Sequence, residues 1–160
     1  GLVSTPILTI HGTEVRSSAI RAAIATGGVS LAARMLGRPF AVDGAVVPGD
    51  ARGRTIGFPT ANVEMPQGFV RPAGGVYAVQ CLVDGVIHDG VCNVGTRPTF
   101  GGGPELIEVH LIDESLDLYE KMVRVSFIGR IRNEQRFASV DALQAMIADD
   151  IVRAREILSL

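Results

Sequence analysis

The stretch from Val76 to Val94 reads VYAVQCLV-DG-VIHDGVCNV, two apolar runs rich in β-branched residues and separated by Asp84-Gly85. An Asp-Gly pair between such runs is the strongest short-range signal for a β-hairpin, because both residues of a type I′ turn need a positive φ. The stretch therefore predicts two antiparallel strands, Val76–Val83 and Val86–Val94.

Four further extended segments surround this hairpin. About six short strands separated by turn signals are typical of a small closed antiparallel barrel or a sandwich. The 19 Gly, eight Pro and absent Trp also favour a turn-rich, mainly β protein over a helical bundle. The four segments are Phe40–Val47, Phe58–Val63, Glu105–Asp113 and Met122–Arg130.

Helical signals lie at both ends of the chain. Ser139 is a candidate N-cap for a helix of about five turns, in which apolar residues repeat at intervals of three and four as far as Leu158. Near the start, Ser17 and Ser18 are candidate N-cap residues of a first short helix, and Ser30 opens a second that ends at Gly37. We expect a short helical segment over residues 1–36 and a barrel domain over residues 37–160.

The overall composition excludes several classes of protein. With 160 residues and a formal net charge of −2, the chain predicts one compact domain that does not bind nucleic acid through its phosphates. It has neither an apolar run of about 18 residues nor a signal-peptide pattern, which predicts a soluble cytoplasmic protein without membrane contact. Cys81 and Cys92 lie in strand-like runs without zinc-type spacing, which predicts two buried free thiols.

The stretch Gly49–Asn62, GDARGRTIGFPTAN, contains the densest functional signal. Its Gly53-Arg54-Thr55 has a superficial likeness to a phosphate-binding P-loop. That reading fails because the spacing from Gly49 is one residue short, Arg replaces Lys, and Pro59 blocks the helix that should follow. What remains is a glycine-rich loop that leads directly into an extended segment.

The end of this stretch has the chemistry of a metal site. In an extended segment Thr60 and Asn62 point to the same face, and a hydroxyl beside an amide oxygen suits Mg²⁺, which completes its shell with water and substrate phosphates. Arg52 or Arg54 could add positive charge for an anionic group. The alternative is that Gly53 and Gly57 only make turns and Thr60 only caps a strand.

The segment Leu106–Asp113 alternates in polarity. Its odd positions form an apolar face, while Glu108 and His110 share the other face. A carboxylate there can accept the proton of an attacking alcohol, although a lone strand glutamate is ordinarily a solvated residue. We expect His110 to be a surface or rim residue.

The chain resembles a known family over about Leu36 to Leu158. Its Arg52–Asn62 stretch is similar to the signature of riboflavin kinases, in particular the C-terminal kinase module of bacterial bifunctional riboflavin kinase/FAD synthetases. Four more stretches agree in order and spacing: Gly75-Val76-Tyr77, Asn93–Phe100, Glu108–Asp113 with Leu118-Tyr119 behind it, and Arg132–Phe137.

This resemblance implies a six-stranded Greek-key barrel with a C-terminal helix. It implies transfer of the γ-phosphoryl group of ATP to the ribityl 5′-hydroxyl of riboflavin, giving FMN and ADP. The family's metal ligands fall on Thr60 and Asn62, with Mg²⁺ as the expected ion and Mn²⁺ or Zn²⁺ as alternatives, and its catalytic base falls on Glu108. The loop over the ATP phosphates would comprise Gly53, Arg54, Thr55, Gly57 and Pro59.

The segment Ser17–Arg21 also resembles the bifunctional family, at the end of its FMN adenylyltransferase module. No His-x-x-His or His-x-Gly-His pattern accompanies it, so we expect only a helix cap and a surface charge there. Two alternatives to a riboflavin kinase stay open: a barrel that binds flavin or nucleotide without catalysis, and a fragment of a bifunctional FAD synthetase. The sequence gives no oligomeric state.

We expect the flavin pocket between the Phe127–Phe137 segment and the start of the last helix. The flat, mostly apolar isoalloxazine needs an apolar platform with polar groups at its edges. Alternatively, the helix residues of this platform belong to the plain packing of helix on barrel. The predicted platform residues are Phe137, Leu143 and Met146, and the predicted edge residues are Arg132 and Glu134.

Overall fold

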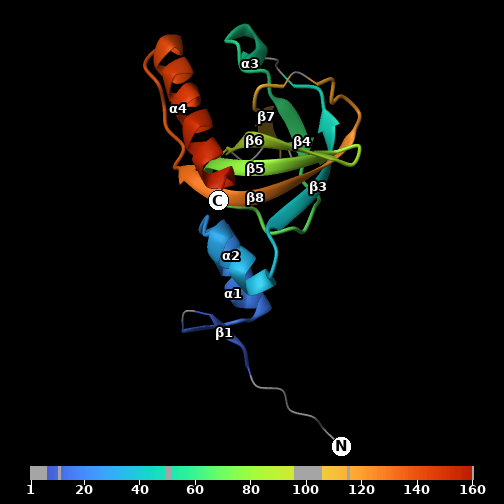
Figure 1. Ribbon diagram of the computed structural model, residues 1–160, viewed down its shortest axis with the longest axis vertical. Helices are drawn as coiled ribbons and strands as arrows, with labels where there is room; N and C mark the ends of the chain where they lie inside the picture. Colours follow the sequence, from blue (N-terminus) through green and yellow to red (C-terminus); the bar gives the residue numbers. More distant parts are fainter. Residues whose placement is uncertain (1–6, 11, 50–51, 96–105, 115, 160) are drawn as a thin grey trace, which may run out of the picture.

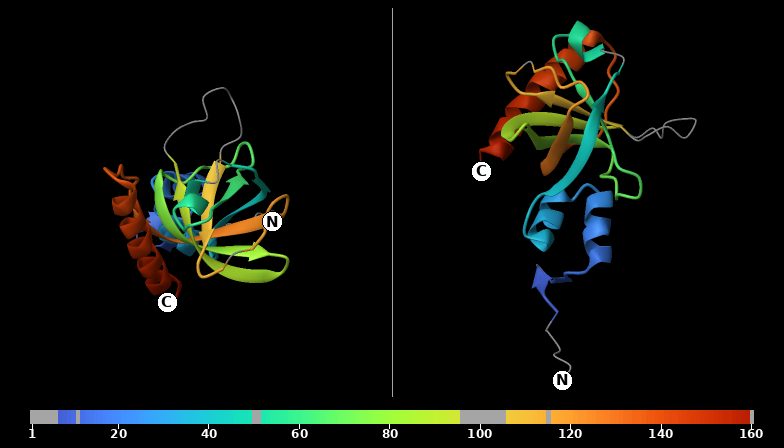
Figure 2. Two further views of the ribbon diagram at one scale, coloured as in Figure 1. Left: turned by 90° about the horizontal axis from the view of Figure 1, so that it is seen from above. Right: turned by 90° about the vertical axis from the view of Figure 1, so that its right-hand side faces the viewer.

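The computed structural model describes residues 7–10, 12–49, 52–95, 106–114 and 116–159. Six strands form a closed barrel in the order β3-β4-β7-β6-β5-β8, and all pairings are antiparallel (Figures 1 and 2). The predicted closed antiparallel barrel is confirmed. The strands are β3 (Phe40–Val47), β4 (Ala61–Glu64), β5 (Gly75–Val83), β6 (Val86–Val94), β7 (Leu106–Leu111) and β8 (Met122–Arg132).

The β5–β6 hairpin has the turn that its sequence demands. Asp84 and Gly85 have φ values of 49° and 85°, and Val83 pairs with Val86 across them. By contrast, β4 begins three residues later than the predicted segment Phe58–Val63. Pro59 has no N–H to donate to a ladder, so the residues around it approach the sheet without joining it.

The barrel interior is filled by alternate residues of every strand. Tyr77 and Phe127 meet edge to face with ring centroids 5.4 Å apart, and Phe40 packs against Phe127 at 5.8 Å. Cys81 and Cys92 are both buried and free, as the sequence predicts. These contacts make the inside of the barrel a packed core.

The N-terminal helices α1 (Ser17–Ala25) and α2 (Val29–Leu36) lie against the lower end of the barrel (Figure 1). Their apolar residues, with Ile24 and Val29 fully buried, belong to the same core cluster as the barrel interior. The predicted Ser N-cap is wrong, because Ser17 is the first residue of α1 and its N-cap is Arg16, which makes no side-chain cap.

Two smaller features of this end also differ from expectation. Helix α2 begins at Val29, one residue before Ser30, and ends as predicted at Gly37 in the left-handed conformation. A short hairpin of β1 (Thr9–Ile10) and β2 (Thr13–Glu14) precedes α1 and has no clear sequence signal.

The C-terminal helix α4 (Val140–Leu158) lies along the outer face of β5, β6 and β8 (Figure 2). As predicted, Ser139 caps it, accepting a hydrogen bond of 3.2 Å from the amide of Ala142. The single-turn helix α3 (Arg52–Thr55) lies beside the start of α4 (Figure 1). No helix in the described part of the chain is long and apolar enough to span a membrane.

Candidate active site

A cavity of about 310 Å³ lies on the outer face of the barrel, where α3 and its loop meet α4. Its walls come from the glycine-rich segment, from β5, β6 and β7, from the end of β8 and from α4. The cavity thus brings together residues from six separate parts of the sequence. Of the predicted site residues, it is lined by Gly53, Thr60, Glu108, Arg132, Glu134, Phe137 and Leu143.

A single row of side chains crosses the barrel beneath this cavity. In the strand register Asn62 pairs with Glu108, Glu108 with Asn93, Asn93 with Val76, and Val76 with Arg132. Residues directly opposite each other in a sheet share a face, so the row carries amide, carboxylate, amide, apolar and guanidinium groups side by side. Asn93 is the member that sequence reasoning missed, although it belongs to a stretch matching the family.

Glu108 lies on the outer face because its neighbours on β7 face inwards. Ile107 and Val109 are at most 1% exposed in the barrel core, whereas Glu108 is exposed towards the cavity. The predicted alternation is therefore confirmed. His110 shares this face as a half-buried cavity residue, and its Nδ1 atom lies 2.8 Å from the carbonyl oxygen of Pro59.

Two glycines leave room for the predicted metal ligands. A Cβ atom at Gly53 would overlap the carbonyl oxygen of Phe58 and crowd Oγ1 of Thr60 at 3.3 Å, and one at Gly49 would overlap the side-chain amide of Asn62. The backbone of the loop therefore packs closely against both side chains. A hydroxyl and an amide oxygen are hard donors that suit Mg²⁺, which takes its other ligands from water and phosphates.

The described residues contain no cluster of three or more His, Cys, Asp or Glu side chains that could hold a metal on its own. Thr60 and Asn62 offer two oxygen donors, a set that Mg²⁺ would complete with water or ligand oxygens.

The glycine-rich loop is tied to α4. The amide of Phe58 donates to the carbonyl of Gly53 at 2.8 Å, and Gly57 turns the chain with a φ of 84°. Nε2 of Gln144 on α4 then donates to the carbonyl of Ile56 at 3.1 Å. This bond connects α4 to the loop beside the cavity, which Ile56 lines.

A second cavity of about 440 Å³ adjoins the first. On one side it is lined by Arg54, Pro59 and Thr60, and on the other by residues between β7 and β8, including Asp117 and Tyr119. Thr60 lines both cavities. The predicted loop residues thus divide between the two, with Gly53 on the first and Arg54 and Pro59 on the second, while Thr55 and Gly57 are exposed and line neither.

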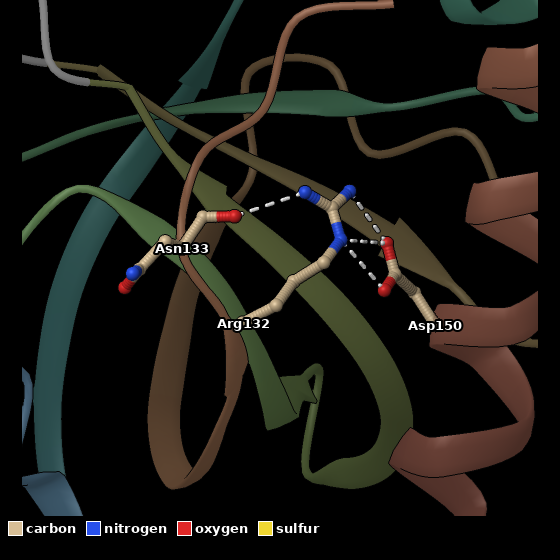
Figure 3. Close-up of polar contacts among 3 residues, drawn as sticks. All are labelled: Arg132, Asn133 and Asp150. Atoms are coloured by element: carbon tan, nitrogen blue, oxygen red, sulfur yellow. Dashed lines mark hydrogen bonds and ion pairs between the residues drawn. The ribbon is translucent and has the colours of Figure 1, made fainter.

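An ion pair connects β8 to α4 inside the first cavity (Figure 3). Nε of Arg132 lies 2.9 and 3.1 Å from the two carboxylate oxygens of Asp150, and Nη2 lies 2.8 Å from Oδ2. The Asp150 side chain is 2% exposed and that of Arg132 is 15% exposed. The guanidinium also lies over the ring of Phe137 at 5.6 Å and donates from Nη1 to the carbonyl of Asn133.

The predicted flavin platform is found in part in the cavity wall. Phe137 and Leu143 line it, but Met146 does not, and Ile147 lines it instead. Leu143 and Ile147 are four residues apart and so share one face of α4. Sequence reasoning also missed Asp150, because its partner Arg132 comes from another element.

The chain is similar to proteins of one known family. A family model described as riboflavin kinase matches residues 36–158. The bifunctional riboflavin kinase/FMN adenylyltransferase of Escherichia coli K12 is 48% identical over 160 residues, covering 99% of this chain and 51% of that protein. Its counterpart in Bacillus subtilis is 42% identical, covering 89% and 46%. The chain thus spans about half the length of the curated relatives it matches.

Two solved structures share the fold. A crystal structure named as the macrolide-efflux protein from Streptococcus pneumoniae superposes with a TM-score of 0.88 and 37% identity, covering 94% of this chain and 50% of that one. Riboflavin kinase from Trypanosoma brucei superposes with a TM-score of 0.55 and 24% identity, covering 76% and 80%. At that identity the second comparison supports the fold alone.

Proposed function

Because the chain belongs to the riboflavin kinase family, we propose that it transfers the γ-phosphoryl group of ATP to the ribityl 5′-hydroxyl of riboflavin, giving FMN and ADP. The observation that carries this proposal is the pair of adjoining cavities with Thr60 in both walls and Glu108 in one of them. Phosphoryl transfer needs a donor and an acceptor held in line, a metal at the phosphates and a base for the acceptor hydroxyl.

The second cavity suits the nucleotide. Arg54 supplies positive charge at its wall, and the loop after α3 brings backbone groups close to the same space. Thr60 and Asn62 would hold the divalent cation, for which we propose Mg²⁺ over Zn²⁺ because both donors are hard oxygens; the same donors suit Mn²⁺ as the alternative ion. When bound, such an ion neutralises the charge of the phosphate oxygens.

The first cavity suits riboflavin. Phe137, Leu143 and Ile147 provide an apolar wall for the isoalloxazine, and the polar row across the sheet leads from Arg132 to Glu108. A ribityl chain lying along this row would bring its terminal hydroxyl to Glu108. We assign the carboxylate of Glu108 as the group that accepts the hydroxyl proton during attack on phosphorus.

We further propose that residues 37–160 form the kinase domain and that residues 1–36 add a helical segment to it. The packing of Ile24 and Val29 in the barrel core supports a structural role for this segment. We also propose that the chain acts in the cytoplasm, in keeping with ATP and riboflavin as its substrates. We propose no catalytic role for Ser17 and Ser18.

The test is a turnover assay with the purified chain, riboflavin, ATP and Mg²⁺, in which FMN and ADP are separated and quantified. A Glu108→Gln variant should bind riboflavin as the wild type does and lose about 10²–10⁴ in rate, the usual effect of removing a general base. The control is Glu156→Gln on the exposed face of α4.

Two outcomes would support the alternatives instead. Riboflavin binding without FMN formation would favour a barrel that only binds its ligands. Formation of FAD and pyrophosphate from FMN and ATP would favour the activity of a bifunctional synthetase.

A further inference from the structure

We propose that His110 positions the metal-binding residue Thr60 by fixing the peptide group between Pro59 and Thr60. This inference rests on the proposed function, and it assigns a role to a residue that sequence reasoning placed only at the rim. Its basis is the 2.8 Å contact between Nδ1 of His110 and the carbonyl oxygen of Pro59.

The chemistry of the two partners decides which nitrogen carries the proton. A carbonyl oxygen can only accept, so Nδ1 of His110 must be the donor. This fixes the tautomer of a neutral ring, with Nε2 left as an acceptor. The ring is held from a second side by Phe58, which meets it edge to face with ring centroids 5.6 Å apart.

The backbone at Pro59 makes this one hydrogen bond effective. The pyrrolidine ring fixes φ of Pro59, and the planar peptide group includes both its carbonyl and the N and Cα atoms of Thr60. The remaining soft dihedral is ψ of Pro59. A donor on the carbonyl oxygen fixes ψ and therefore the positions of the N and Cα atoms of Thr60, so that only φ and χ1 of Thr60 are left to direct its hydroxyl.

The local fold explains why such a support is needed. Strand β4 begins at Ala61, so Thr60 precedes the ladder that would otherwise hold it. Thr60 is exposed and lines both cavities, where its hydroxyl has to stay aimed at the phosphates. His110 comes from β7, the strand that pairs with β4, and so connects this end to a rigid part of the barrel.

The test uses two substitutions that separate the nitrogens of the imidazole. In His110→Asn the side-chain amide can place an N–H near the position of Nδ1, whereas in His110→Gln it reaches the region of Nε2. His110→Phe removes both. As a control, Gln80→Met removes a side-chain hydrogen bond from the strand surface outside both cavities.

The principal measurement is calorimetric binding of ADP at a series of Mg²⁺ concentrations, which requires no turnover. For His110→Gln and His110→Phe we expect the Mg²⁺ concentration at half-maximal ADP binding to rise about two- to tenfold, the effect of losing one hydrogen bond. His110→Asn and Gln80→Met should stay within twofold of the wild type. Riboflavin affinity, measured by fluorescence quenching, should change less than twofold in Gln80→Met, which lies outside both cavities.

The inference is overturned if His110→Gln keeps the wild-type Mg²⁺ dependence, or if a folded His110→Asn loses as much as His110→Gln. It is also overturned if both variants bind Mg²⁺ and ADP normally but turn over about a hundredfold more slowly, because His110 would then act on a proton. Should His110→Phe fail to fold by circular dichroism, the Asn and Gln pair still decides. A wild type that binds Mg²⁺ and ADP but forms no FMN contradicts the proposed function and leaves the positioning role intact.

Discussion

The Arg132–Asp150 pair leads to a prediction about the free energy of unfolding. Replacing Asp150 with Ala removes all three contacts of 2.8–3.1 Å between the two side chains. The guanidinium of Arg132 then has no carboxylate partner, although the Arg132 side chain is only 15% exposed. Loss of one partner from a buried pair costs about 3–5 kcal/mol, because the remaining charge is desolvated without compensation. Arg132 keeps its bond to the Asn133 carbonyl and some contact with water, so we expect the lower end, about 3 kcal/mol.

The double variant Arg132→Met with Asp150→Leu should behave differently. Replacing both charges with apolar side chains of similar volume is often neutral or stabilising, so most of the lost stability should return. Urea unfolding with linear extrapolation measures all three free energies. A cost below about 1 kcal/mol for Asp150→Ala, or a double variant as unstable as the single one, would refute the assignment of a desolvated pair.

The same variants separate stability from binding. Because the guanidinium of Arg132 lies over Phe137 in the cavity wall, the double variant should regain stability but bind riboflavin more weakly than the wild type. Fluorescence quenching of riboflavin provides this measurement. If the stable double variant binds riboflavin with wild-type affinity, Arg132 does not contribute to the flavin site and the pair has a purely structural role.

Three smaller predictions follow from other sites. Thr60→Ala should weaken ATP use and be rescued in part by added Mg²⁺, since water can replace one ligand; a metal titration of turnover would contradict this if rescue were absent. Burial raises the pKa of Cys81 to about 11 and also raises the pKa of Cys92, so iodoacetamide at pH 8 should modify neither thiol until urea is added, as mass spectrometry can check. Hydrogen bonding from Arg124 lowers the pKa of Asp43, so the pair stabilises the fold above the ordinary aspartate pKa and loses this effect as pH falls through the lowered value. Because both side chains are more than half exposed, Asp43→Asn should barely change the free energy of urea unfolding at pH 7, and the difference should shrink as the pH is lowered.

Local signals explain how much of the fold could be predicted from the sequence. The Asp84-Gly85 turn, the alternation around Glu108 and the Ser139 cap each depend on residues close together in the chain, and the structure contains all three. The predicted N-cap of α1 was wrong because Ser17 is the first helical residue. The N-cap position belongs to Arg16, and arginine carries no capping signal in the sequence.

The candidate site was harder to predict because its walls come from distant segments. Single-strand alternation cannot reveal that Asn93 lies beside Glu108, since this follows from the register of β6 on β7. Nor does helical periodicity show which of Met146 and Ile147 reaches the cavity, because the rotation of α4 is set by what it packs against. Asp150 was missed for the same reason, as its partner comes from another element.

The position of α4 therefore determines the shape of the proposed flavin site. A closed barrel has a packed interior, so a ligand on its outer face needs a second wall, and α4 provides it. The helix is held at its start by the bond from Gln144 to Ile56 and near its middle by the Arg132–Asp150 pair. Near its end it packs closely on Gly129, where a Cβ atom would approach α4 to 2.8 Å. The cavity lies between the first two of these contacts. An ion pair is a costly way to join a helix to a sheet, because both charges lose their hydration. In return, the Arg132–Asp150 pair places a fixed polar group beside the apolar wall that we propose for the isoalloxazine.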